Sequence, residues 1–301
     1  MPPTLLESSS PVDIEMTLLS GQTFHWHLTG SSGPETINDR PGFVLLHRSS
    51  ALCLKQVTSK LIHIESFGNP LPKEELRAVT GLNLDLETIR QITSRDNRVK
   101  RLIHRYAGLT ILRQDPFECL VSFLSSGMSN IPRIRRNLRD LRIELGSPIS
   151  GSPFYSLPAA RVVAEAGEST LRKLGFGFRA KYIARTCAHL VSHGINLNHW
   201  KPLPDHDIKS RLLAFPGVGH KIAECVLLFG FGRLTAFPVD VWVGRALQNL
   251  WPGHPNRSLE RWRRWAKTRW GHTAGYVQQV LFMAARSGIL FRRSEKEGPL
   301  T

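Results

Sequence analysis

Residues 212–225 decide the fold, and they read Leu212-Leu213-Ala214-Phe215-Pro216-Gly217-Val218-Gly219-His220-Lys221-Ile222-Ala223-Glu224-Cys225. A helix that stops at Pro-Gly, turns through Gly-Val-Gly and restarts at once predicts a helix-hairpin-helix. Gly217 and Gly219 permit the tight turn and bring backbone N–H groups to the surface at a helix N-terminus, where a DNA phosphate can bind. The alternative is an ordinary corner between two helices.

Two charged residues, one in the hairpin and one after it, are candidates for catalysis. Lys221 lies in the first turn of the second helix, where the unfavourable interaction of a cation with the helix dipole costs about 0.3–1 kcal/mol. Nineteen residues later Asp240 stands at the predicted N-cap of the next helix. A lysine nucleophile beside a fixed carboxylate suits cleavage of an N-glycosidic bond, because positive charge develops on the sugar. Taken singly, Lys221 is equally explained as a solvated lysine and Asp240 as a helix cap.

The net charge is strongly positive and unevenly distributed. The chain has 40 Lys and Arg against 24 Asp and Glu, hence +16, and a pI near 10.4. Residues 1–115 hold 13 basic and 12 acidic residues, whereas residues 116–301 hold 27 and 12, a net charge of +15. This balance favours a polyanionic partner such as nucleic acid, bound by the C-terminal part.

Composition and sequence pattern argue against a membrane-spanning, an exported and a cysteine-ligated metal protein. The chain has 301 residues, of which 41% are hydrophobic and 21% charged, as in globular proteins of one or two domains. No apolar run approaches the roughly 18 residues that a membrane span needs, and the start does not resemble a signal peptide. The four cysteines show no metal-ligand spacing. We expect an intracellular monomer without metal or cofactor, cytoplasmic or nucleoid-associated in a bacterium and nuclear in a eukaryote.

The pattern of the chain predicts an α+β fold in two domains. Segments 42–47 and 51–57 favour an antiparallel hairpin, and the Gly- and Ser-rich stretch 29–40 before them favours a loop. Helical periodicity dominates from about residue 86. We predict a small α+β domain over 1–115, an all-helical domain over 116–291 and a frayed tail over 292–301. The expected helices of the second domain are 116–127, 131–144, 159–174, 179–193, 206–214, 219–230, 239–250, 258–270 and 274–286.

The hairpin followed by Pro238-Val239-Asp240 resembles the helix-hairpin-helix glycosylase superfamily, in which lysine marks the bifunctional members. Further segments resemble the eukaryotic-type 8-oxoguanine DNA glycosylases, and they span residues 20 to 282: Ser20-Gly21-Gln22-Thr23-Phe24-His25-Trp26, Asp115-Pro116-Phe117-Glu118-Cys119, Ser129-Asn130-Ile131-Pro132-Arg133-Ile134, Leu174-Gly175-Phe176-Gly177-Phe178-Arg179-Ala180-Lys181-Tyr182 and Gly275-Tyr276-Val277-Gln278-Gln279-Val280-Leu281-Phe282. The resemblance implies a TBP-like N-terminal domain and a substrate of duplex DNA containing oxidised guanine. It also implies base excision followed by strand cleavage at the abasic site.

The same resemblance assigns roles to the residues of a base pocket. It makes Lys221 the Schiff-base nucleophile and Asp240 its electrostatic partner. The backbone carbonyl of Gly21 faces the N7–H that only the oxidised guanine possesses. The base pocket is completed by Cys225 and Phe282, which sandwich the base, Gln278, which reads its Watson–Crick edge, and Pro238, which lines the wall. Taken singly, Cys225 and Phe282 are better explained as core residues and Gly21-Gln22 as an ordinary turn, but their joint occurrence favours the base pocket.

Other residues are implied in holding the DNA around the vacated position. Arg133 and Arg179 contact the orphan cytosine, and Phe178 is a wedge beside the flipped nucleotide. Met128 stands where the family has the asparagine that helps to fill the vacated space, and Trp242 stands in place of a histidine. Most of the remaining arginines of 133–142 and 257–269 are expected to be solvated or to face phosphates.

Three competing functions remain to be weighed. A monofunctional alkylbase glycosylase can share the N-terminal domain and the aspartate but lacks a lysine at the position of Lys221. A non-catalytic helix-hairpin-helix module explains the charge and the turn but not the matched base pocket. An adenine-mismatch or thymine-glycol enzyme of this superfamily usually has four clustered cysteines after the hairpin, which this chain lacks.

Overall fold

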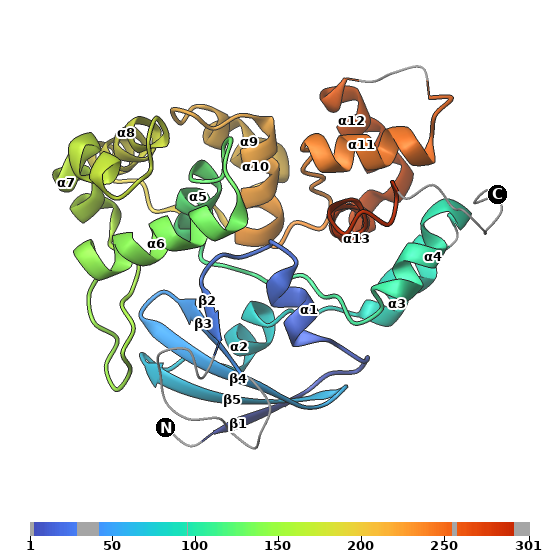
Figure 1. Ribbon diagram of the computed structural model, residues 1–301, viewed down its shortest axis with the longest axis horizontal. Helices are drawn as coiled ribbons and strands as arrows, with labels where there is room; N and C mark the ends of the chain where they lie inside the picture. The colour runs from blue at the N-terminus through green and yellow to red at the C-terminus, as the bar shows by residue number, and fades with distance from the viewer. Residues whose placement is uncertain (1–2, 29–41, 95, 255–257, 292–301) are drawn as a thin grey trace.

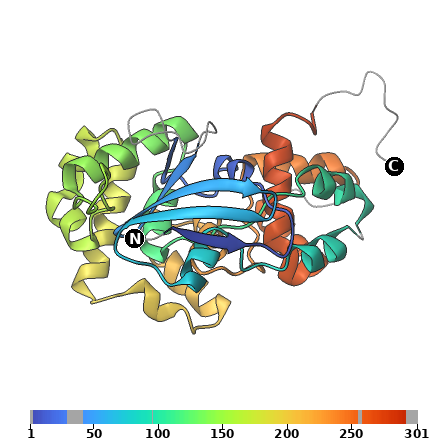
Figure 2. The same ribbon diagram turned by 90° about the horizontal axis from the view of Figure 1, so that it is seen from below.

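The computed structural model describes residues 3–28, 42–94, 96–254 and 258–291. A five-stranded sheet lies along one side of the molecule, and helices form two groups above it (Figure 1). Seen from the side of the sheet, the two groups flank the strands (Figure 2). The predicted loop 29–40 and tail 292–301 lie outside the described residues. The α+β fold is confirmed.

The sheet is antiparallel throughout, with strand order β1-β5-β4-β3-β2. Its strands are β1 Thr4–Glu7, β2 Trp26–Leu28, β3 Phe43–His47, β4 Ser50–Thr58 and β5 Leu61–Gly68. The predicted hairpin is confirmed as β3 and β4, with Phe43 opposite Leu54 and His47 opposite Ser50. The reversal needs a positive φ of 53° at Arg48. The strands β1, β2 and β5 were not predicted.

All nine helices predicted after residue 115 are present in the described residues. They are α5 Pro116–Leu124, α6 Ile131–Leu145, α7 Ala160–Lys173, α8 Arg179–Ser192, α9 Asp205–Leu213, α10 His220–Cys225, α11 Val241–Leu250, α12 Leu259–Trp270 and α13 Ala274–Arg286. The helix expected over 219–230 ends as α-helix at Cys225 and continues as a π-helical turn, Val226–Gly230. The earlier helices are α1 Ile14–Leu19, α2 Lys73–Val79, α3 Leu86–Thr93 and α4 Asn97–Arg105.

The N- and C-terminal parts of the chain are joined by buried contacts. The ring of Phe24, between α1 and β2, meets Phe123 of α5 edge to face at 5.6 Å. The Tyr106 hydroxyl after α4 lies 3.1 Å from the Ser287 hydroxyl at the end of α13. The division at residue 115 stays a prediction. The junction between the two parts holds the cavity in which the predicted residues gather.

Candidate active site

The hairpin between α9 and α10 has the backbone that its glycines predict. Gly217 has a φ of +79°, and a Cβ added there would lie 2.5 Å from Cγ of Tyr182, so a side chain is excluded. Gly219 is the N-cap of α10 and is exposed, with no heavy atom within 4 Å of its added Cβ. The backbone at this turn is therefore open to a ligand, and its binding of a DNA phosphate stays a prediction.

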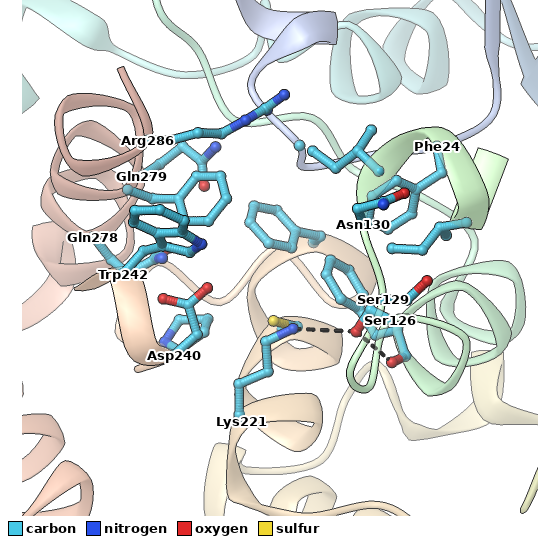
Figure 3. Close-up of a pocket in the computed structure, with 18 of the residues that line it drawn as sticks. Phe24, Ser126, Ser129, Asn130, Lys221, Asp240, Trp242, Gln278, Gln279 and Arg286 are labelled. Carbon is cyan, nitrogen blue, oxygen red and sulfur yellow. Dashed lines mark hydrogen bonds between the residues drawn. The ribbon is translucent and has the colours of Figure 1, made fainter. Parts of the chain in front are cut away.

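One cavity of about 450 Å³ brings together the residues predicted for catalysis and for base binding. They come from the loop after α1, from α10, from the segment before α11 and from α13, and they are Gly21, Lys221, Cys225, Pro238, Asp240, Gln278 and Phe282. Figure 3 shows several of these side chains around a common space. The proximity of these residues is a finding, and their individual roles stay predictions.

Lys221 projects from the first turn of α10 into this cavity (Figure 3). Its Nζ lies 3.3 Å from Oγ of Ser126 and 4.9 Å from the centre of the Phe123 ring. Both partners belong to α5 or to the turn that follows it. Ser126 therefore holds the lysine toward the cavity, a role that no motif in the sequence signals.

Asp240 is both a helix cap and a residue of the cavity. Its Oδ1 accepts a hydrogen bond from the backbone N–H of Val243 at 2.8 Å, which confirms the predicted N-cap of α11. The carboxylate is thereby fixed in orientation while it lines the same space as Lys221. Capping and catalysis are compatible at this position.

Glu224, which the sequence did not single out, ties the helix of Lys221 to the segment of Asp240. Its carboxylate is fully buried and accepts a hydrogen bond from the backbone N–H of Phe237 at 2.8 Å. Lys209 and Lys267 approach the same carboxylate at 2.9 Å and 2.8 Å. Burial acts to raise the pKa of Glu224, but the two lysines outweigh it and hold the pKa below its ordinary value. The ionised carboxylate thus anchors the strand-like segment leading to Asp240.

The Gly21 loop is held by one buried hydrogen bond to α13 and another to Thr110. Gly21 has a φ of +80°, and an added Cβ would lie 3.2 Å from both Ile131 and Phe282. Nε2 of Gln279 donates to the carbonyl of Ser20 at 2.8 Å, and Nε2 of Gln22 donates to the carbonyl of Thr110 at 2.7 Å. The backbone at Gly21 therefore has a fixed orientation beside Phe282.

Two buried polar groups show what the cavity can accept. Burial, with Asp240 adding to it and Lys221 opposing it, raises the pKa of the Cys225 thiol to about 11. The thiol is neutral at physiological pH and presents a polarisable surface to a ligand. Oε1 of Gln278 is buried and has no hydrogen-bond partner among the described residues. A ligand N–H reaching this oxygen would remove the cost of leaving it unpaired.

The residues predicted at the orphan cytosine lie outside the lining of this cavity. Met128 is 92% exposed, with a positive φ of 48°, and Phe178 is 48% exposed. Arg133 is exposed, whereas Arg179 is buried and donates to the carbonyl of Gly127 at 2.9 Å. Arg179 therefore braces the loop that carries Met128. Trp242 lines the cavity and is 42% exposed, with Arg245 5.7 Å from its ring centre.

Two of the arginines in the stretches 133–142 and 257–269 are buried. Arg142 and Arg263 are 3% and 4% exposed, and they form ion pairs with Glu118 and Glu260. Among the described residues, no cluster of three His, Cys, Asp or Glu side chains could hold a metal ion. In the same part of the chain, no helix has the length and apolarity to cross a membrane.

Comparison with known proteins identifies the family. Residues 4–120 match the N-terminal domain of 8-oxoguanine DNA glycosylase, and residues 132–271 match the HhH-GPD superfamily of base excision DNA repair proteins. The chain belongs to the 8-oxoguanine DNA glycosylase family. It is a DNA repair enzyme of the N-glycosylase/DNA lyase class.

Relatives of this family align over most of the chain. A probable N-glycosylase/DNA lyase of Methanothermobacter thermautotrophicus is 30% identical over 251 residues, covering 75% of this chain and 79% of that protein. The N-glycosylase/DNA lyase OGG1 of Arabidopsis thaliana is 30% identical, covering 90% and 76%. The structure of the Clostridium acetobutylicum 8-oxoguanine glycosylase/lyase with double-stranded DNA containing cytosine opposite 8-oxoguanine has a TM-score of 0.80 and 26% identity, covering 95% and 98%.

Proposed function

We propose that this glycosylase removes 8-oxoguanine opposite cytosine from duplex DNA, with Lys221 as the nucleophile, and then cleaves the strand on the 3′ side. The observation that carries the proposal is the single cavity that holds Lys221, Asp240 and the predicted base-binding residues. The Clostridium acetobutylicum relative, solved with cytosine opposite 8-oxoguanine, supports the choice of substrate.

The chemistry follows from an amine and a carboxylate that line one space. The neutral Nζ of Lys221 attacks C1′ of the flipped nucleotide, and the bond from C1′ to N9 breaks with its electrons moving to the base. The amine loses a proton and the departing base gains one. The bond from C1′ to O4′ then breaks, O4′ takes its electrons and the remaining proton of Nζ, and an imine is left between Nζ and C1′. Asp240 stabilises the positive charge that develops on the sugar. Loss of a proton from C2′ then expels the 3′ phosphate.

Discrimination against normal guanine rests on the Gly21 loop. A backbone carbonyl at Gly21 accepts a hydrogen bond from N7–H of 8-oxoguanine, whereas N7 of guanine is an acceptor and leaves that carbonyl unpaired. The neutral Cys225 thiol and the Phe282 ring enclose the base, and the unpaired Oε1 of Gln278 accepts an N–H from its Watson–Crick edge. Selectivity against guanine therefore depends on N7–H, the donor that only the lesion presents, whereas Gln278 reads an edge that guanine shares.

The orphan cytosine is assigned to the surface outside the cavity. Exposed Arg133 donates to cytosine, Phe178 occupies the space beside the flipped nucleotide, and Arg179 fixes the loop of Met128. The long side chain of Met128, in place of an asparagine amide, offers no hydrogen bond there. We expect the preference for cytosine to depend chiefly on Arg133. A monomeric state remains a prediction.

Trapping of a covalent complex tests the proposal. The protein is incubated with a duplex holding 8-oxoguanine opposite cytosine, and borohydride is added to reduce the imine. We expect base release and a stable adduct in the wild type and in Lys60→Gln, an exposed lysine between β4 and β5. Lys221→Gln should bind the duplex without base release or adduct. An adduct of normal yield in Lys221→Gln would exclude Lys221 as the nucleophile.

A further inference from the structure

A second cavity, of about 250 Å³, lies between the start of β2 and one face of α6. Its walls include Trp26 and His27 on the β2 side and Arg135, Arg136, Arg139 and Arg142 on the α6 side. Phe24 and Pro132 line both this cavity and the base pocket, so the two cavities are neighbours. We call this second cavity the arginine pocket. The proposed glycosylase mechanism makes no use of it.

Positive charge in the arginine pocket exceeds the available counter-charge. Arg142 meets Glu118 at 3.4 Å, and Arg139 meets its chain neighbour Asp140 at 2.9 Å. Arg135 and Arg136 form no ion pair among the described residues. Arg135, Arg139 and Arg142 follow one another at spacings of four and three residues, so their side chains share a face of α6. This face presents more cationic groups than the protein itself neutralises.

One of these arginines is buried with a donor unused. Arg142 is 3% exposed and its Nε has no hydrogen-bond partner among the described residues, although Nη1 donates to the carbonyl of Tyr155. Burying an unpaired donor of a charged group is costly. Arg135 is held in place by Trp26, because its guanidinium lies 3.4 Å from the ring centre and donates to the Trp26 carbonyl at 2.8 Å. The donors are thus preorganised before any ligand arrives.

The ionisation of His27 reports the field inside the arginine pocket. Burial, together with the charges of Arg135, Arg142 and Arg139, lowers the pKa of His27 to about 4. The other groups facing it are the Phe154 ring at 4.9 Å and the buried His25, whose pKa also lies well below its ordinary value. A cation is excluded from such a site, and an anion is favoured.

We propose that the arginine pocket binds a phosphoryl group, supplied either by the DNA backbone or by phosphate free in solution. A tetrahedral, negatively charged group can accept hydrogen bonds from several guanidinium groups at once. The cavity of about 250 Å³ is several times larger than the roughly 30 Å³ that one water molecule occupies in the liquid, so it has room for a phosphoryl group. The inference stands independently of the glycosylase mechanism.

Nuclear magnetic resonance of the His27 ring tests this proposal in the intact protein. The pH titration of His27 is recorded alone, with inorganic phosphate, with undamaged duplex, and with chloride at matched ionic strength. A bound phosphoryl group should raise the pKa of His27, because it offsets the nearby arginines, while the exposed His206 serves as the control ring. An effect of phosphate identifies the free ion as the source, and an effect of the duplex alone identifies the DNA backbone.

Variants separate this site from general charge effects. The double change Arg136→Gln with Arg139→Gln alters two exposed side chains and leaves the buried Arg142 and its partner Glu118 in place. We expect it to weaken binding of the phosphoryl source at least about tenfold, the loss expected for a charge-assisted hydrogen bond. Lys60→Gln, which removes one exposed positive charge between β4 and β5, should leave that affinity unchanged. Equal shifts with chloride, equal losses in both variants, or no shift with either source would overturn the proposal.

Discussion

Replacing Asp240 by asparagine separates its charge from its role as a helix cap. Oδ1 of Asp240 accepts the backbone N–H of Val243 at 2.8 Å, and an asparagine Oδ1 can accept the same bond. Asn and Asp are nearly equal as N-caps, so the main loss in stability is the helix-dipole term of about 0.3–1 kcal/mol. At roughly 2–4 °C per kcal/mol for a chain of this size, Tm should fall by less than about 4 °C.

The effect on base release should be much larger. Removing one preorganised group that stabilises transition-state charge typically lowers kcat by about 10²–10³. We expect a loss of this size in single-turnover release of 8-oxoguanine, with little change in duplex affinity, because the charge acts mainly when the sugar becomes cationic. Asp240→Ala should show a similar rate loss and an additional cost of about 0.5–2 kcal/mol, because it also removes the cap.

The two variants give distinct outcomes for the two roles. Fast base release in Asp240→Asn, within a few-fold of the wild type, would refute an electrostatic role for the carboxylate. If, in addition, only Asp240→Ala lost activity and melted early, Asp240 would act solely as the cap of α11. Thermal melts of both proteins must accompany the kinetics, so that the rates refer to folded enzyme.

Three further predictions follow from the geometry. Gly21→Val should lose excision but keep affinity for undamaged duplex. Because the φ of Gly21 is +80°, the change should also lower the free energy of unfolding by about 1–2 kcal/mol. Excision at the wild-type rate would show that the Gly21 loop does not recognise the base. Arg133→Gln should reduce the preference for cytosine over adenine opposite the lesion, and an unchanged preference would exclude Arg133 from recognition of the orphan cytosine. Arg264→Gln should instead weaken binding to all duplexes alike and reduce the salt dependence of that binding. The free energy of unfolding should decline as pH falls from 6.5 towards 4, because the unfolded chain takes up a proton that the half-buried His27 of the folded protein does not. His27→Gln should reduce this slope in urea melts.

The sequence predicted those parts of the fold that have a strong local signal. The helices after residue 115 are long and periodic, and the β3–β4 hairpin combines apolar runs with a short turn. Strand β2 has three residues and β1 has four, too few for alternation to distinguish them from loops. Strand β5 was missed although its polar and apolar residues alternate. The π-helical turn after Cys225, which packs against α5, has no local sequence signature.

The residues of the candidate site likewise fall into those that the sequence predicted and those that only the structure shows. Lys221, Asp240 and the hairpin glycines were found because their residue types and spacing carry chemistry. Ser126, Glu224 and Gln279 were missed because their roles exist only after distant segments meet. Gln279 and the Ser20 carbonyl that it holds are 259 residues apart in the chain. No local pattern marks such a pair, and only the folded structure shows it.

Catalysis and selectivity depend on different contacts of the fold. Lys221 and Asp240 lie on neighbouring segments of the helical part, joined by the buried Glu224. The Gly21 loop, in contrast, is held at the cavity by hydrogen bonds to segments distant in the chain, from Gln279 of α13 and to Thr110. Loosening the Gln279 contact should therefore impair recognition of the lesion before it impairs the chemistry of the lysine. Imine formation on an abasic site, which needs no base recognition, should be the activity least sensitive to disturbance of the N-terminal sheet.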